Sequence, residues 1–301
     1  MRARATAIAV LAALMLASCG GDGSSSDDAI AEPVVIGTKN FTESVILGEL
    51  YGQALRAEGV SVELQRSVGS TEVINVALRD GLLDMYPEYI GVLLAEVHKI
   101  VKRPASAREA YGRAKNREEK RGFTLLEPTR LSNENALAVT RSFSRRRGAR
   151  SIADLKTLRP RPLIGAAPEF QNRFEGLVGL RRRYGLTRPR FERVDTNKGR
   201  QYPLLESGRL DVALVYTTDP QLAGERYVLL SDPQGIFAEQ HVAPLISQQI
   251  LSEKGPRLAR TLNAVSAVLT TPVMRRLNAE AADLSPAQVA DRFLRARGLK
   301  G

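Results

Sequence analysis

"LRDGLLDMYPEY" (78–89) and "LESGRLDVALVY" (205–216) share the pattern that decides the fold. Both read Leu-x-x-Gly-x-Leu-Asp, and in both an apolar run follows and ends in a tyrosine five residues after the aspartate. The pattern predicts a helix that ends at glycine, a tight turn and a short strand. We therefore expect two similar α/β lobes, each with a tyrosine at the carboxyl end of a strand, where open α/β sheets bind ligands.

Short apolar segments alternate with amphipathic segments through most of the chain. "PVVIG" (33–37) and "PLIGAA" (162–167) read as buried strands, and each is followed by a helical pattern. This order predicts an α/β protein whose sheets are mostly parallel. From Pro244 onward the pattern is helical or mixed, and the segment that begins at Ser285 predicts an amphipathic helix.

Length, composition and charge narrow the function classes. The 301 residues are 43% hydrophobic and 26% charged, which is typical of a globular protein with one large core or two moderate ones. The formal net charge of +11 would by itself admit nucleic acid as a partner. The arginine-rich runs at 141–150 and 181–190, however, lack the interleaved aromatic residues on which bases stack. We expect them to be solvated faces and expect no nucleic-acid partner.

The N-terminal segment "MRARATAIAVLAALMLASCG" (1–20) has the organisation of a secretory signal. Arg2 and Arg4 precede an apolar run that ends in small residues, and the run is shorter than the roughly 20 residues of a transmembrane helix. Its ending resembles a bacterial lipobox, in which Cys19 would be lipidated after removal of residues 1–18. A simple cleaved signal, or a buried thiol at Cys19, are the alternatives.

A Gly/Ser/Asp-rich segment follows and predicts a flexible tether over 19–32. We therefore expect an extracytoplasmic protein that is lipid-anchored to the cell membrane. Loss of the two signal arginines would leave a charge of +9, which would face anionic headgroups.

Metal, cofactor and catalytic signals are weak. His98 and His241 lack the spacing of metal ligands, and the single cysteine excludes an intramolecular disulfide or a thiolate cluster. No HExxH, P-loop or GxSxG motif occurs. We expect no metal, no cofactor and no enzymatic activity. Asp84 and Glu88 remain an alternative, as the carboxylate pair of an extracytoplasmic hydrolase.

Tyrosines at strand ends in two lobes suit a quaternary ammonium ligand. Such a cation has no N–H and cannot be held by hydrogen bonds, but the faces of aromatic rings attract it. The chain has no tryptophan, so tyrosine or phenylalanine must form any such cage. A carboxylate on the same ligand would call for a guanidinium partner.

Five ordered motifs resemble those of the glycine betaine/choline-binding proteins of osmoprotectant ABC importers. They are "IGTKNFTE" (36–43), "DMYPEYIG" (84–91), "NENALAV" (133–139), "EFQNRFEG" (169–176) and "VYTTD" (215–219). The resemblance covers about residues 33–297. It implies a two-lobed type II periplasmic-binding-protein fold, with lobe 1 at 33–136 plus 237–301 and lobe 2 at 137–236. It also implies a monomer that closes over a solute and delivers it to permease and ATPase subunits.

The resemblance also transfers ligand contacts onto this sequence. They fall on Tyr89, Tyr202, Tyr216, Arg173, Asn135, Lys39 and Thr38. The three tyrosines would form the cage, the arginine would grip a ligand carboxylate, and the residues of the first loop would help with anionic groups. Phe41 is expected to be a hydrophobic staple or a core residue instead of a cage wall.

Two departures from the family pattern bear on the ligand. Val92 stands where similar proteins have threonine, and Asn135 stands where they often have a cage tyrosine. The cage is thinner and offers an amide, so choline or a larger or more polar betaine joins glycine betaine as a candidate. An amino acid or another carboxylate, held mainly by Arg173, is the alternative ligand class.

Overall fold

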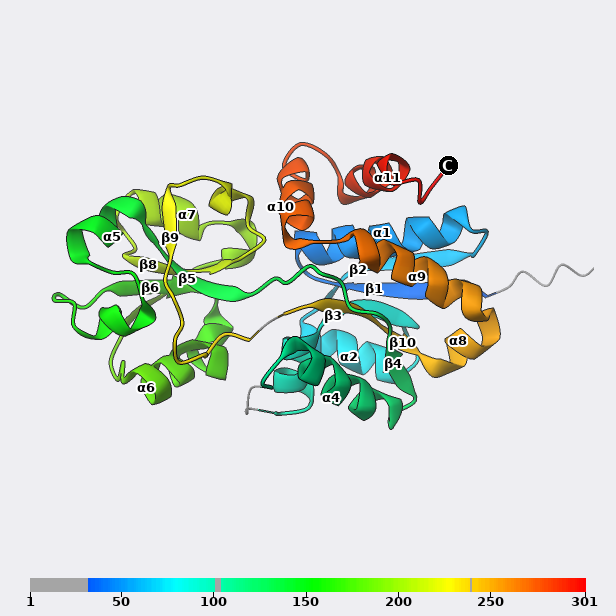
Figure 1. The fold of residues 1–301 in the computed structure, drawn as a ribbon, viewed down its shortest axis with the longest axis horizontal. Coiled ribbons are helices and arrows are strands. Elements are labelled where there is room, and N and C mark those ends of the chain that lie inside the picture. The colour runs from blue at the N-terminus through cyan, green and yellow to red at the C-terminus, as the bar shows by residue number, and fades with distance from the viewer. Residues whose placement is uncertain (1–31, 101–103, 239) are drawn as a thin grey trace, which may run out of the picture. The chain divides into compact units, whose positions relative to one another are not determined.

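The computed structural model describes residues 32–100, 104–238 and 240–301 (Figure 1). Residues Glu32–Gly301 form one compact unit. The predicted signal segment, Cys19 and the predicted tether up to Ala31 lie outside the described residues. None of the described helices combines the length and the apolar character that crossing a membrane requires.

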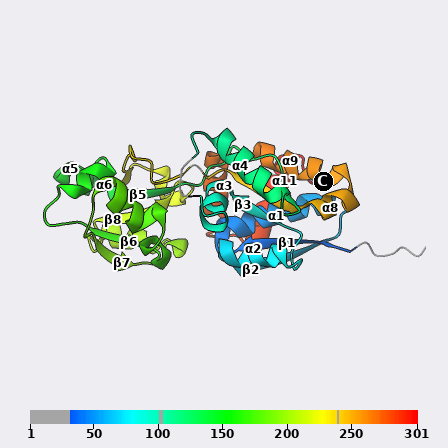
Figure 2. The same cartoon turned by 90° about the horizontal axis from the view of Figure 1, so that it is seen from below.

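Two five-stranded sheets organise this unit (Figures 1 and 2). The first has the order β2-β1-β3-β10-β4, with β1 Val34–Lys39, β2 Val62–Gly69, β3 Met85–Tyr89, β4 Phe123–Leu125 and β10 Val242–Ser247. The second has the order β7-β6-β8-β5-β9, with β5 Asn135–Thr140, β6 Leu163–Ala166, β7 Arg190–Arg193, β8 Val212–Tyr216 and β9 Tyr227–Leu229. The residue boundaries of the two lobes stay a prediction.

The sheets are mixed, and in each of them four strands run in one direction and one strand runs against them, so the expectation of mostly parallel sheets holds. Strand β10 runs antiparallel to β3 and β4, and β5 runs antiparallel to β8 and β9. The chain enters each of these two strands directly from the other sheet. No helical crossover within one sheet precedes them in the described part of the chain, and such a crossover is what makes neighbouring strands parallel. The segment from Pro244, expected to be helical or mixed, begins with the last residues of β10 and continues as helices.

Helices flank both sheets. They are α1 Thr42–Ala57, α2 Thr71–Arg79, α3 Ile90–Val92, α4 Ala107–Glu119, α5 Arg141–Arg147, α6 Gly179–Tyr184, α7 Gln201–Glu206, α8 Gln248–Lys254, α9 Pro256–Val268, α10 Thr271–Glu280 and α11 Pro286–Ala296. The predicted helix at Ser285 is confirmed. The Ser285 hydroxyl accepts the backbone N–H of Gln288 in a capping box, and Pro286 occupies the first turn.

The two segments with the shared pattern adopt the same structure. In each, the glycine that follows the helix has φ of +73°. The Asp84 carboxylate accepts the backbone N–H of Val35 at 2.7 Å, and the Asp211 carboxylate accepts that of Leu163 at 2.8 Å. The backbone N–H of each aspartate in turn donates to the carbonyl of the same partner, at 2.8 and 3.1 Å. Each aspartate thus joins its own strand to the adjacent parallel strand.

The leucine before each aspartate explains a glycine in the neighbouring strand. A Cβ atom on Gly37 would lie 2.4 Å from Leu83 Cδ1, and one on Gly165 would lie 2.3 Å from Leu210 Cδ1. Only glycine leaves room for these leucines, which are buried. The shared pattern therefore corresponds to a packing arrangement that occurs once in each sheet. In both sheets it precedes the central strand, β3 or β8, which ends at a tyrosine.

Candidate ligand pocket

A cavity of about 550 Å³ opens at the carboxyl ends of the parallel strands of both sheets. This volume lies within the usual range for small-molecule sites. Segments that follow β1, β3, β6, β7 and β8 line it, together with the start of β5 and part of α10. Of the predicted contacts, the lining contains Lys39, Tyr89, Asn135, Arg173 and Tyr216.

Two tyrosines enter the cavity at matching positions. Tyr89 ends β3 opposite Val242, and Tyr216 ends β8 opposite Asn135. The Tyr216 hydroxyl lies 3.2 Å from Thr196 Oγ1, and burial raises the pKa of Tyr216 to about 12. Both phenols are therefore neutral near pH 7. Their ring faces can contact a cation, and neither hydroxyl ionises at that pH.

Phe41 packs against the core, as expected, and also adds a third ring to the cavity. Its centroid lies 5.8 Å from that of Tyr89 with the planes tilted by 46°, and its side chain lines the cavity. Phe41 directly precedes α1, so the first turn of that helix sets its position.

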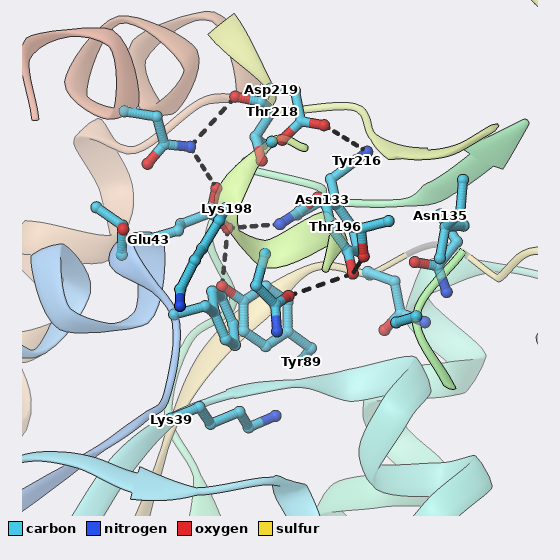
Figure 3. A pocket seen from close by; sticks show the side chains of 18 of the residues that line it. Lys39, Glu43, Tyr89, Asn133, Asn135, Thr196, Lys198, Tyr216, Thr218 and Asp219 are labelled. Atoms are coloured by element: carbon cyan, nitrogen blue, oxygen red, sulfur yellow. Dashed lines mark hydrogen bonds between the residues drawn. The ribbon is translucent and has the colours of Figure 1, made fainter. Parts of the chain in front are cut away.

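Glu43 organises the polar side of the cavity (Figure 3). Its carboxylate accepts hydrogen bonds from the Tyr89 hydroxyl, Asn133 Nδ2 and Asn278 Nδ2, each at 2.8 Å. Asn278 Nδ2 also donates to the carbonyl of Thr218 at 3.2 Å. Glu43 therefore fixes the orientation of the Tyr89 ring while its own charge has only neutral donors as partners.

Glu175 is a second carboxylate of the lining. It accepts Asn135 Nδ2 at 2.8 Å and the backbone N–H of Ala238 at 3.1 Å. Burial raises the pKa of Glu175 to about 7, although these two hydrogen bonds oppose the shift. Asn135 thus serves to hold this carboxylate.

Asp219 is a third carboxylate of the lining. It accepts the Tyr202 hydroxyl at 2.6 Å and the backbone N–H of Tyr216 at 3.0 Å, and burial raises its pKa to about 6. Tyr202 itself is buried and does not line the cavity, because its hydroxyl is directed to Asp219 and its ring packs edge-on against Tyr227. The structure thus places Tyr202 behind the cage instead of in it.

The charge of Lys39 is balanced by a carboxylate within the protein. Its ammonium forms a close, buried ion pair with Glu88 and lies 4.9 Å from the centre of the Tyr89 ring. Glu88 also accepts the hydroxyl of Tyr86 at 3.0 Å. The lysine was expected to help with anionic groups, but its charge is already matched by a carboxylate.

The other two cations of the lining also face carboxylates. The Arg173 guanidinium lies 3.6 Å from both Glu72 and Glu96, and its side chain is 32% exposed. Lys198 lies 3.5 Å from Asp195. By contrast, no Lys or Arg within the described ranges lies within 4 Å of the carboxylates described above at positions 43, 175 and 219. The cavity therefore carries a net negative character.

Some predicted site residues lie elsewhere. Thr38 is fully buried outside the lining, and its hydroxyl accepts the backbone N–H of Ser67 at 2.9 Å. Neither Asp84 nor Glu88 lines the cavity, since the first holds Val35 and the second holds Lys39. A hydrolytic pair at these positions has no access to a bound solute. In the described part of the chain, no cluster of three or more His, Cys, Asp or Glu side chains could hold a metal ion.

Several lining residues were missed in the sequence. They are Glu43, Asn133, Glu175, Asp219 and Asn278. The first four stand inside the five quoted motifs, so a signal existed for them. Asn278 lies on α10, outside every motif, and only the folded chain brings it to the cavity.

Comparisons with known proteins show which family this chain resembles. The family described as the substrate binding domain of the ABC-type glycine betaine transport system matches residues 32–296. The chain is 30% identical over 276 residues to the glycine-betaine-binding protein of Pseudomonas aeruginosa, which covers 88% of each chain. It is 27% identical over 282 residues to the glycine betaine-binding protein YehZ of Escherichia coli, which covers 89% of this chain and 92% of that protein.

A solved structure described as a glycine betaine/carnitine/choline ABC transporter has the same fold. It superimposes with a TM-score of 0.74 at 24% identity and covers 88% of this chain and 99% of its own. The predicted type II periplasmic-binding-protein fold is confirmed. Substrate-binding proteins of ABC importers are extracytoplasmic binding proteins and not enzymes as a family. The chain belongs to the family of substrate-binding domains of ABC-type glycine betaine transport systems.

Proposed function

We propose that this protein is the solute receptor of an ABC importer and holds a quaternary ammonium compound in the cavity. The observation that carries the proposal is the combination of three aromatic rings with three carboxylates that have only neutral hydrogen-bond donors. The rings belong to Phe41, Tyr89 and Tyr216. A trimethylammonium group has no N–H to offer those carboxylates, but it is attracted by their negative charge, which is partial for Glu175 near pH 7, and by the ring faces.

Glycine betaine, choline and carnitine, which appear in the names of the matched proteins, all carry that group. The second end of the ligand would meet Arg173, which is partly exposed and held by two carboxylates at 3.6 Å. A ligand carboxylate would have to compete with Glu72 and Glu96 for this guanidinium. Choline, which has no carboxylate, would avoid that competition, so it stands beside glycine betaine as a leading candidate.

The proposed cycle is capture, closure of the two lobes and delivery to permease and ATPase subunits. We propose that the protein acts as a monomer without catalysis, with no nucleic-acid partner, and that lipid on Cys19 anchors it to the cell membrane. Asn278, which donates to Glu43 and to the carbonyl of Thr218, would keep the cavity walls in register during closure.

Thermal unfolding with a panel of solutes tests the ligand class. Choline, glycine betaine, carnitine, proline betaine and ergothioneine are each added at millimolar concentration, and at least one should raise the Tm. A ligand that binds only the folded state stabilises it by RT ln(1 + [L]/Kd). The Tyr216→Ala variant should lose most of the shift. If no solute of the panel shifts the wild-type Tm, the quaternary ammonium class is wrong.

The alternative ligand class is an amino acid or another carboxylate, held by Arg173. In that case Arg173→Ala abolishes binding, and Tyr216→Ala only weakens it. The proposal made above predicts the reverse order, because the ring face supplies the main contact to the cation. Measuring the Kd of both variants for the same solute by calorimetry separates the two classes.

A further inference from the structure

The basic charge of the chain is concentrated in one short stretch. Residues 141–200 contain 17 Lys and Arg but only five Asp and Glu, a net charge of +12. Since the whole chain has a formal net charge of +11, the remaining 241 residues together carry −1. A charge excess confined to a fifth of the chain is a local feature and not a general adaptation for solubility.

The fold gathers part of this charge at one surface, which we call the arginine face. It comprises the exposed Arg159, Arg161, Arg188 and Arg190 and the half-buried Arg147. Arg147 donates to the carbonyl of Arg159 at 2.9 Å, and Arg161 donates to the carbonyl of Arg188 at 3.1 Å. The end of α5 and the loops that lead into β6 and β7 therefore lie side by side.

The arginine face has no acidic counterpart. Across residues 32–100, 104–238 and 240–301, no carboxylate lies within 4 Å of its guanidinium groups, whereas Arg209 and Arg226 pair with Glu192 and Glu206. Guanidinium groups of the arginine face donate to backbone carbonyls, and that of Arg147 also lies 5.5 Å from the centre of the Phe143 ring. Neither kind of contact supplies a negative charge. Unpaired guanidinium groups are suited to bidentate contacts with phosphate oxygens.

The arginine face and the cavity lie at opposite ends of the same strands. Arg161 and Arg188 precede the parallel strands β6 and β7, while Ala167 and Thr196, which follow them, line the cavity. Four strand residues separate the two ends by about 13 Å. A partner on the arginine face would therefore leave the cavity accessible.

We propose that the arginine face binds the anionic headgroups of the membrane across which the importer works. Its side chains extend over three segments without a cavity among the described pockets, which suits a surface of many phosphates better than one small anion. The family delivers its cargo to a membrane. This inference goes beyond the proposed function, because it depends neither on the identity of the solute nor on lipid at Cys19.

Vesicle sedimentation tests the surface directly. The chain without residues 1–19 keeps the whole compact unit and lacks the predicted lipid site. It should sediment with vesicles of equal parts phosphatidylglycerol and phosphatidylcholine, not with phosphatidylcholine alone, and should dissociate as salt increases. Each surface arginine is expected to contribute about fivefold to the partition constant, so Arg159→Gln/Arg161→Gln/Arg188→Gln should lower it about a hundredfold.

The matched control removes three exposed arginines from other parts of the chain, Arg79→Gln/Arg260→Gln/Arg292→Gln. Both variants have the same net charge, and the control should keep most of its binding to anionic vesicles. A variant with lysine at positions 159, 161 and 188 should also bind, which separates loss of charge from loss of structure. Absence of wild-type binding to anionic vesicles would overturn the proposal. So would equal losses in the two glutamine variants, or binding to soluble polyaspartate without binding to vesicles, which would indicate an acidic protein partner.

Discussion

The substitution Lys39→Met tests how much the buried ion pair at the wall of the cavity contributes to stability. The side chains of Lys39 and Glu88 are 4% and 0% exposed, so water can replace neither partner. Removing the ammonium leaves Glu88 with the hydroxyl of Tyr86 and a backbone N–H, but without a counter-ion. Breaking a buried pair in this way costs about 3 to 5 kcal/mol of the free energy of unfolding. For a domain of this size we expect the Tm to fall by about 10 °C.

The assay is urea unfolding followed by circular dichroism, repeated for Glu88→Gln and for the double variant Lys39→Met/Glu88→Gln. The double variant has no buried charge at this site, so it should recover most of the stability that either single change loses. A cost below about 1 kcal/mol for Lys39→Met would refute the reasoning, since it would mean that Glu88 finds another partner or water. A double variant no more stable than Lys39→Met would refute it as well.

Three further predictions concern the pH dependence of stability, the two aspartates of the repeated segments, and Tyr202. Burial raises the pKa of Glu175 from 4.5 to about 7, so its contribution to stability is present below pH 4.5 and is lost as pH rises to 7; the difference in unfolding free energy between wild type and Glu175→Gln should fall by about 3 kcal/mol over that range. Asp84→Ala and Asp211→Ala should each cost about 1.5 to 3 kcal/mol in urea unfolding, because each removes one charged acceptor from a strand N–H, and clearly unequal costs would argue against equivalent roles. Tyr202→Phe should cost about 1 kcal/mol by losing its bond to Asp219 but leave the Kd of the bound solute unchanged in calorimetry, and a tenfold weaker Kd would place its hydroxyl in the site.

The sequence predicted those features that depend on local pattern. The glycine, leucine and aspartate of each repeated segment specify a turn and one strand contact, so the tyrosines at 89 and 216 could be placed at matching strand ends. Ser285 and Pro286 marked a helix start for the same reason, since a cap involves only neighbouring residues.

Features that depend on distant pairing were not predictable. Strand β10 lies between β3 and β4 because of residues more than a hundred positions away, and its own pattern around Pro244 also fits a helix. The partner of Lys39 is 49 positions away, so the sequence suggested a free cation where the structure has an ion pair. Thr38 and Tyr202 stand beside lining residues in the chain, but their hydroxyls are directed to Ser67 and Asp219.

The hydroxyl partners of the tyrosines have an optical consequence. The chain has eight tyrosines and no tryptophan, so its intrinsic emission comes from tyrosine. Five of the eight hydroxyls donate to carboxylates, a contact that quenches phenol fluorescence; they belong to Tyr86, Tyr89, Tyr184, Tyr202 and Tyr227. Tyr216 lies in the cavity and pairs with Thr196 instead. It is therefore a bright emitter at the site, and a solute that settles against its ring should change the ultraviolet fluorescence of the unlabelled protein.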